Sequence, residues 1–221
     1  SCAYDAVFTI LFNIWSEDIS KFSTIFNDLN PGLLGTLSDA FIHHINGKYT
    51  LEGVREYMRH KFFRKNPTHF PLGQDTSVHS ILNELLSSVN VVTSSFRFCG
   101  NGHPVDQCPS TNNNCQLIPF PEHPNTMLQT YINDFIVASA AECPVCCIQL
   151  RRRFIFLSAP QILALDITQI TSPLSSVLDI SVGGYRFTYH MRGIIYHGDN
   201  HFTARFITSS GQLWFHDGMS T

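Results

Sequence analysis

The sequence carries little charge. Asp, Glu, Lys and Arg make up only 14% of the 221 residues, and the formal net charge is −3 at pH 7. A chain without a positive excess offers no electrostatic case for nucleic acid, so we expect no nucleic-acid partner. The one basic run, Arg151-Arg152-Arg153, is better interpreted as a strand or loop whose charged ends lie in water. Because 43% of the residues are hydrophobic, the low charge indicates a globular domain rather than disorder.

Long apolar runs are also lacking. No segment reaches the roughly 18 residues that a membrane-spanning helix needs. The longest candidates, Ala3–Trp15 and Phe154–Ile170, are interrupted by polar residues. The start shows no secretory signal pattern, and it reads Ser1-Cys2 without an initiator Met, so we expect a fragment or a processed product. We expect no membrane association.

The cysteines do not suit a disulfide scaffold. There are seven, an odd number, and six of them fall between Cys99 and Cys147. Small disulfide-bonded secreted domains favour an even count. Clustered Cys and His residues with C-x-x-C spacing favour a metal site in a reducing compartment. We therefore predict an intracellular protein, cytoplasmic or nuclear.

The candidate metal ligands form two pairs, Cys143-x-x-Cys146 and Cys99-x-x-x-His103. Two such pairs can close a tetrahedral Zn²⁺ site, which would be structural because four protein ligands leave no open position. Cys108 or Cys115 could replace His103. We interpret Cys147, next to Cys146, as a packing residue. The alternative is a degenerate cluster that holds no metal.

Hydrophobic periodicity divides the chain into a helical first part and a strand-rich last part. Apolar residues three or four apart predict helices over 2–15, 33–46, 50–65 and 76–89, with Thr50 as a helix cap, and a short helix over 127–138. Alternation predicts strands over 91–98, 148–157, 161–168, 185–197, 201–208 and 212–216, with a hairpin turn at 209–211. Residues 100–125 are expected to be rich in loops. Helices followed by an antiparallel sheet predict an α+β fold.

One constellation could carry nucleophilic catalysis. Cys2 lies directly before the first amphipathic helix, and a helix N-terminus favours the thiolate form of a cysteine. His201 and Asp217 fall on two strands of a predicted hairpin, where they can lie side by side as a base and the group that orients it. We interpret Asp5 only as an acidic helix-start residue and expect Trp214 to pack beneath the hairpin.

The segments that carry these residues resemble boxes of the ubiquitin-specific proteases, a papain-like cysteine peptidase family. "SCAYDAVFTILFNIW" resembles the Cys box, and "YRFTYHMRGIIYHGDNHFTARFITSSGQLWFHDG" resembles the His box, in which His197 is the first, non-catalytic histidine. Residues 72–86 and 151–167 are similar to the Gln-Asp box and to the strands between fingers and palm. Asn200 stands where the family usually has Gly before the base, which suggests a divergent branch close to the SUMO-directed isopeptidases.

The resemblance implies one catalytic domain over 1–221. It would comprise a helical thumb (1–90), zinc-ribbon fingers (91–155) and a β palm (156–221). It implies a thiol-dependent isopeptidase that removes ubiquitin or a SUMO-like modifier from its conjugates, with Cys2 as nucleophile, His201 as base and Asp217 as orienting residue. The only oxyanion donor that we can name is the backbone N–H of Cys2. Two alternatives remain: a modifier-binding pseudo-peptidase that does not cut, and a zinc-binding interaction module unrelated to peptidases.

Overall fold

The computed structural model describes residues 2–105, 111–118, 127–168, 173–199 and 201–218. It divides into two compact units. Unit 1 combines Ser1–Ser87 with Arg192–Thr221, and unit 2 is Ser88–Met191. The candidate catalytic residues all belong to unit 1 and the candidate metal ligands to unit 2, so each site is described within its own unit.

Unit 1 consists of helices and one antiparallel sheet. Its helical elements are α1 (Cys2–Glu17), α2 (Ile19–Leu29), the π-helical turn η1 (Pro31–Gly35), α3 (Thr36–Ile45), α4 (Leu51–Lys65) and α5 (Val78–Leu85). Its sheet has the order β11-β10-β9, formed by β9 (Gly193–Gly198), β10 (His201–Ile207) and β11 (Leu213–Asp217). The sheet packs on α1, and Ala204 at the centre of β10 is fully buried.

The helices of unit 1 enclose an aromatic core around Trp15. Trp15 is fully buried, stacks on Phe12 and lies against Phe41. Its indole N–H donates to Ser38 Oγ at 3.0 Å and to Ser23 Oγ at 2.9 Å, so burial leaves no orphaned donor. The predicted cap of α4 is confirmed, because Thr50 Oγ1 accepts a hydrogen bond from the Gly53 N–H at 3.0 Å.

Unit 2 is built on a four-stranded antiparallel sheet of order β2-β1-β5-β4. Its elements are β1 (Thr93–Phe98), β2 (Thr111–Asn113), β3 (Leu117–Ile118), α6 (Leu128–Asp134), β4 (Ile136–Glu142), β5 (Gln149–Phe156), β6 (Ala164–Leu165), β7 (Val177–Val182) and β8 (Tyr185–His190). The short strands β3 and β6 pair in parallel, and β7 and β8 form a hairpin. A hydrophobic cluster around Tyr131, Phe135 and Ile180 joins α6 to this hairpin.

The α+β arrangement of helices and antiparallel strands agrees with the sequence, but several boundaries were wrong. The predicted strand 185–197 is two strands in different sheets, because the Met191 N–H bonds to Ser176 O while Arg192 O accepts from Ile207 N–H. The predicted helix 127–138 ends at Asp134, since Phe135 adopts a left-handed conformation (φ 35°) and β4 follows. Only Ala164–Leu165 of the predicted strand 161–168 is a strand, and β7 had not been predicted.

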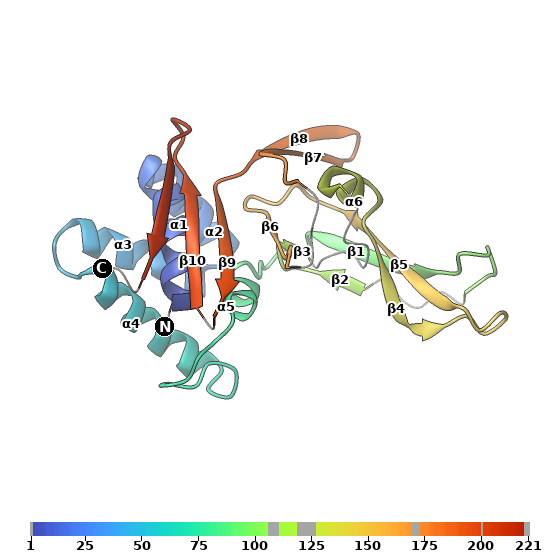
Figure 1. The fold of residues 1–221 in the computed structure, drawn as a ribbon, viewed down its shortest axis with the longest axis horizontal. Coiled ribbons are helices and arrows are strands. Elements are labelled where there is room, and N and C mark those ends of the chain that lie inside the picture. The colour runs from blue at the N-terminus through green and yellow to red at the C-terminus, as the bar shows by residue number, and fades with distance from the viewer. Residues whose placement is uncertain (1, 106–110, 119–126, 169–172, 200, 219–221) are drawn as a thin grey trace. The chain divides into compact units, whose positions relative to one another are not determined.

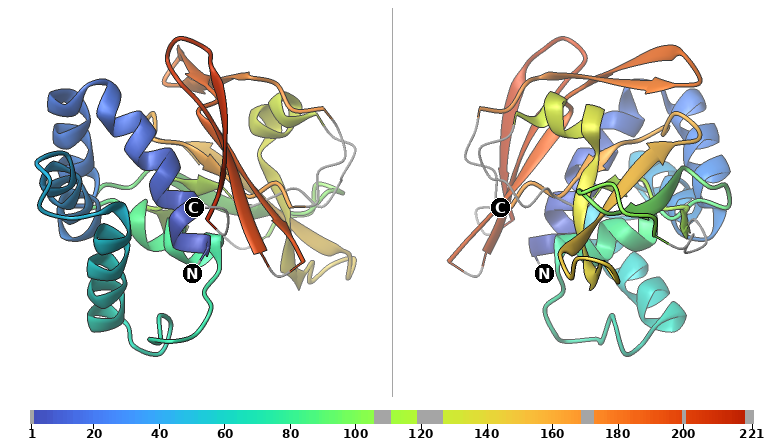
Figure 2. Two further views of the ribbon diagram at one scale, coloured as in Figure 1. Left: turned by 60° about the vertical axis from the view of Figure 1, so that its left-hand side comes forward. Right: turned by 90° about the vertical axis from the view of Figure 1, so that its right-hand side faces the viewer.

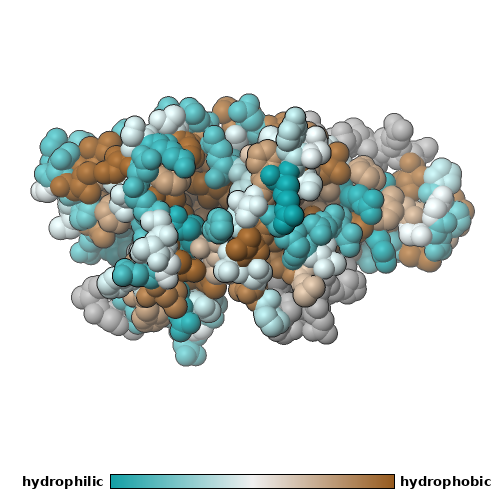
Figure 3. All heavy atoms as spheres, turned by 90° about the horizontal axis from the view of Figure 1, so that it is seen from above, coloured by the Kyte–Doolittle hydropathy of each residue, from teal (hydrophilic) through white to brown (hydrophobic). Residues whose placement is uncertain are grey.

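The surface is mixed in polarity. On the face shown in Figure 3, hydrophobic residues lie in patches between hydrophilic ones. Within the described ranges, no helix combines the length and the apolar character that crossing a bilayer requires. Trp214 was wrongly expected to be packed: 54% of it is exposed, because β11 is an edge strand of the described sheet.

Candidate active site and candidate zinc site

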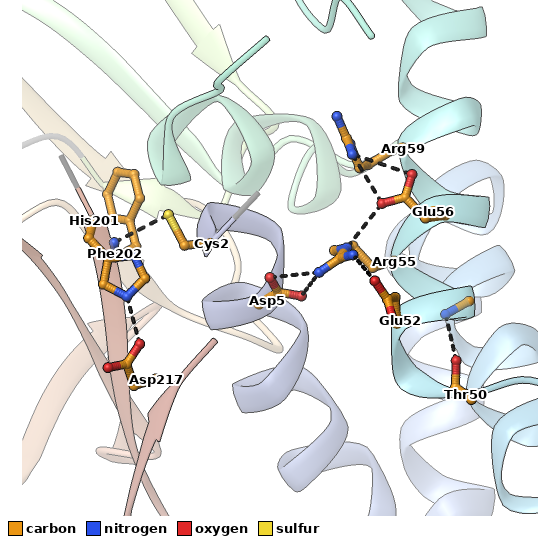
Figure 4. A network of polar contacts seen from close by, with 11 residues as sticks. Cys2, Asp5, Thr50, Glu52, Arg55, Glu56, Arg59, His201, Phe202 and Asp217 are labelled. Carbon is orange, nitrogen blue, oxygen red and sulfur yellow. Dashed lines mark hydrogen bonds and ion pairs between the residues drawn. The ribbon is translucent and has the colours of Figure 1, made fainter. Parts of the chain in front are cut away.

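The start of α1 meets the start of β10. The backbone N–H of Phe202 donates a hydrogen bond to Cys2 Sγ at 3.4 Å, so the thiol lies against the residue that follows His201 (Figure 4). Cys2 is the first residue of the helix as described. An N–H donor together with a helix N-terminus stabilises negative charge on a sulfur atom. The two ends of the sequence therefore come together, as the peptidase interpretation requires.

His201 and Asp217 are joined directly. His201 Nε2 lies 2.7 Å from Asp217 Oδ1, and the two side chains are 19% and 26% exposed. An ionised carboxylate can only accept, so Nε2 carries the proton and the lone pair of the neutral ring is on Nδ1. Nδ1 is the nitrogen that can take a proton from a thiol. Figure 4 shows the imidazole between the carboxylate and the sulfur atom.

The position of α1 along the hairpin is fixed at both of its ends. Near the C-terminal end of α1, Asn13 Nδ2 donates to Ile207 O at 3.2 Å, and Glu17 accepts from the Ser209 N–H at 2.6 Å. Glu17 also forms an ion pair with Arg192. With the bond between Cys2 and Phe202 at the other end, these contacts align the helix with β10 over its whole length.

Gly193 allows the close approach of α1 to the sheet. A Cβ atom at this position would lie 2.6, 2.7 and 2.9 Å from three side-chain atoms of Ile10. Such distances are far below van der Waals contact, so any larger residue would push helix and strand apart. Both views of Figure 2 show the first turn of α1 close to the end of β11.

His197 has a different environment from His201. It lies on β9 opposite Phe202, and the two rings are 4.5 Å apart between centroids. Asn200, which precedes His201, lies outside the described residues. Sequence reasoning did not single out Phe202, because it contributes only a backbone N–H, which leaves no signal in a residue type.

The four predicted metal ligands gather at one end of unit 2. The ligand atoms of Cys99, His103, Cys143 and Cys146 all lie within 4.8 Å of one another. Cys99 Sγ is 3.6 Å from Cys146 Sγ and 3.6 Å from His103 Nδ1, and Cys143 Sγ is 3.8 Å from His103 Nδ1. A tetrahedral zinc ion with the usual bond lengths places neighbouring S and N ligand atoms roughly 3.5–3.8 Å apart. The cluster therefore fits Zn²⁺.

Tight turns bring each pair of ligands together. Gly102 has φ 75°, and its N–H bonds to Cys99 O at 3.0 Å, which turns His103 back toward Cys99. In the second turn, the backbone N–H of Cys146 bonds to the Cys143 sulfur and lowers the pKa of that thiol to about 6, although burial opposes the shift. A thiol that ionises easily is suited to bind a metal ion.

Of the other cysteines of this region that the structure describes, Cys115 and Cys147 take no part in the cluster. Cys147 had been interpreted as a packing residue, and this is wrong: it is exposed. It has φ 56° because the turn requires a left-handed residue there, and its N–H bonds to Cys143 O at 2.9 Å. Cys115 is buried elsewhere in unit 2, where its sulfur accepts from the Leu117 N–H. Cys108 lies outside the described residues.

No family model and no curated protein matches the sequence. Solved structures do. The chain superposes on the SAGA DUB module Ubp8/Sgf11/Sus1/Sgf73 bound to monoubiquitin with a TM-score of 0.56, at 12% identity, over 98% of this chain and 60% of that chain. The same module bound to ubiquitin aldehyde gives a TM-score of 0.54, at 13% identity, over 98% and 62% of the two chains. The yeast module with a variant Sgf73 gives a TM-score of 0.56, at 11% identity, over 98% and 60%.

These matches bear on the fold. The chain spans about 60% of the length of the Ubp8 chains in the first of these structures. Two of the three structures contain ubiquitin, and they give no support to the SUMO-directed branch that the sequence had suggested. The chain has the fold of the chains that it matches in these Ubp8-containing DUB modules.

Proposed function

We propose that the protein is a thiol-dependent hydrolase that releases ubiquitin from its conjugates. The observation that carries this proposal is the meeting of residues from both ends of the chain. Cys2 Sγ accepts from the Phe202 N–H at 3.4 Å, and the neighbouring His201 is bonded to Asp217 at 2.7 Å. A thiol at a helix N-terminus, an imidazole whose Nε2 faces a carboxylate, and that carboxylate are the parts of a nucleophilic triad.

Each residue has a defined task in the proposed reaction. His201 Nδ1 takes the Cys2 proton, and the thiolate attacks the carbonyl carbon of the isopeptide bond to give a tetrahedral oxyanion. His201 then delivers the proton to the departing lysine amine as the C–N bond breaks, leaving a thioester on Cys2. Water, activated by the same imidazole, attacks the thioester, releases the modifier's C-terminal carboxylate and restores the thiol.

The remaining groups support these steps. Asp217 holds the proton on Nε2 and stabilises the imidazolium that forms after proton transfer. The backbone N–H of Cys2 is the oxyanion donor that we assign within the chain. We further propose that the helices of unit 1 form the thumb and its sheet the palm of the catalytic fold. Unit 2 would carry fingers whose Cys₃His cluster binds a structural Zn²⁺.

Ubiquitin with a C-terminal propargylamide tests the proposal. We expect covalent capture by the wild-type protein and no capture by Cys2→Ala, detected as a mass increase of one ubiquitin. A SUMO propargylamide probe serves as the matched comparison. Capture of SUMO but not ubiquitin would assign a different modifier. Non-covalent ubiquitin binding without capture would indicate a pseudo-peptidase and contradict the proposed activity.

A further inference from the structure

The guanidinium group of Arg55 on α4 lies among three carboxylates. Its Nη1 atom donates to both oxygens of Asp5, at 3.1 and 3.0 Å. Its Nη2 atom donates to Glu52 at 2.8 Å, and its Nε atom to Glu56 at 3.1 Å (Figure 4). Glu52 and Glu56 belong to α4 itself, whereas Asp5 belongs to α1. Arg55 is therefore held in place by its own helix and presents one side of the guanidinium to another.

Asp5 lies close in sequence to Cys2 and has neighbours on two other segments of unit 1. It lies in the first turn of α1, three residues after Cys2. Its carboxylate is also adjacent to the residue that follows Asp217, because a Cβ atom on Gly218 would lie 3.4 Å from Asp5 Oδ2. One side chain thus contacts α4 on one side and the end of β11 on the other. The side chains of Arg55 and Asp5 are only 18% and 20% exposed, so water screens their attraction only in part.

A second arginine strengthens the arrangement. Arg59, one turn further along α4, donates to both oxygens of Glu56 at 3.0 and 3.3 Å, and its guanidinium lies 5.9 Å from the ring centroid of Tyr4. Tyr4 is buried and meets Phe62 of α4 edge-on. Glu56 therefore bridges two arginines that both face the first turn of α1. This network restricts Arg55 to one rotamer and gives its contact with Asp5 a fixed direction.

We propose that Arg55 is a positioning residue for the nucleophile. Through Asp5 it fixes the first turn of α1 and, with it, the distance and angle between Cys2 Sγ and the imidazole of His201. It also neutralises the charge of the Asp5 carboxylate, which lies three residues after Cys2 and next to Gly218. The inference rests on the proposed thiol chemistry of Cys2. Arg55 lies on α4, whereas the proposed catalytic residues lie on α1, β10 and β11.

A double-mutant cycle separates positioning from general stabilisation. The variants are Arg55→Met, Asp5→Asn and the two combined, with Lys65→Met as control. The control removes a different ion pair of α4, between Lys65 and Glu84 of α5 at 2.7 Å. Two readouts are used: kcat and KM for a fluorogenic ubiquitin substrate, and the rate of iodoacetamide modification of the peptide that carries Cys2, measured by mass spectrometry on the folded protein.

Positioning predicts a specific pattern. Arg55→Met lowers kcat about 10- to 100-fold with little change in KM, because it disturbs the geometry of the reacting groups and not the binding of ubiquitin. It also changes the Cys2 modification rate. Both effects disappear in the Asp5→Asn background, and Lys65→Met reproduces neither. Arg55→Lys keeps the positive charge but loses the guanidinium that donates to both Asp5 oxygens, and we expect an intermediate kcat.

The inference would be overturned if Arg55→Met lowered kcat by the same factor in the wild-type and Asp5→Asn backgrounds. It would also be overturned if Lys65→Met lowered kcat as much as Arg55→Met, because Arg55 would then only stabilise the helices. If Arg55→Met does not fold, Arg55→Lys alone and in the Asp5→Asn background gives the same comparison. If the wild-type protein neither cleaves nor captures ubiquitin, the proposed function fails. The cycle of Cys2 modification rates still tests the positioning inference in that case, because it requires no ubiquitin.

Discussion

His201 Nε2 and Asp217 Oδ1 lie 2.7 Å apart because of the register of one hairpin. In the pairing of β10 with β11, Asp217 stands opposite Thr203, two residues beyond His201 on the same face of the sheet. Side chains on diagonal positions of neighbouring strands are within reach of each other. A slip of one residue would turn Asp217 to the other face. The register of the hairpin thus fixes how the His201 imidazole and the Asp217 carboxylate face each other.

Asp217→Asn is expected to lower kcat for ubiquitin substrates by about 100-fold or more, because the amide no longer holds the proton on Nε2 of His201. Hydrolysis of a fluorogenic ubiquitin substrate measures the effect. His197→Ala, which alters a neighbouring histidine that contacts the ring of Phe202, is the matched control and should retain most of the activity. Similar losses in both variants would argue against the orienting role of Asp217.

Cys143→Ser is expected to abolish zinc binding and destabilise unit 2. The purified wild-type protein should contain one zinc ion per chain, and the variant close to none, by atomic emission. Loss of about 3 kcal/mol would lower the melting temperature by roughly 6–12 °C. Cys147→Ser is the control, because Cys147 adjoins the same turn but is exposed and outside the cluster. Equal zinc content in all three proteins would refute the site.

Gly193→Ala is expected to destabilise unit 1 by about 1–3 kcal/mol, because the new methyl group would overlap Ile10. Urea denaturation measures the change. In an Ile10→Ala background, the three side-chain atoms that would clash are absent, and Gly193→Ala should lower the free energy of unfolding much less. An undiminished cost in that background would mean that the glycine is needed for a reason other than the close approach of helix and strand.

Burial raises the pKa of Tyr4 from 10.0 to about 12. The folded protein therefore keeps this proton to higher pH than the unfolded chain, and the unfolded chain binds fewer protons between these values. The free energy of unfolding must fall as pH rises from 10 toward 12, by about 2–3 kcal/mol for this group. Denaturant titrations at pH 9 to 12 should show a shallower fall in Tyr4→Phe. Identical pH profiles would contradict this assignment.

Much of the helical part could be predicted from the sequence. The apolar spacing in α1 and the cap at Thr50 are local signals, and both match the structure. The four metal ligands could also be selected, because C-x-x-C and C-x-x-x-H spacings reflect the local turns that bring each pair together. Periodicity could not reveal that the strand ending at His190 and the strand beginning at Gly193 belong to different sheets, since both alternate in the same way.

The catalytic candidates depended on a different kind of information. The local sequence around Cys2 and around His201 does not by itself predict that the two residues lie close together in the fold. Residue types and the predicted hairpin made the constellation a candidate, and the resemblance of two segments to one family strengthened it. The contact of Arg55 with Asp5 had no signal at all, because an arginine among glutamates on a helix is equally well explained by pairs within that helix. Contacts between side chains fifty residues apart follow from the packing of α1 and α4 and not from sequence patterns.

Unit 1 is discontinuous, because its sheet comes from Arg192–Thr221 and its helices from Ser1–Ser87. During synthesis, Cys2 therefore leaves the ribosome almost two hundred residues before His201, and helices α1 to α5 are made before the strands that cover α1. Loop closure over such a separation slows folding, and it exposes apolar surface meanwhile. Cys2 and His201 therefore cannot come together until the hairpin that carries His201 has been made, and we expect the nascent helices to need protection from aggregation until then.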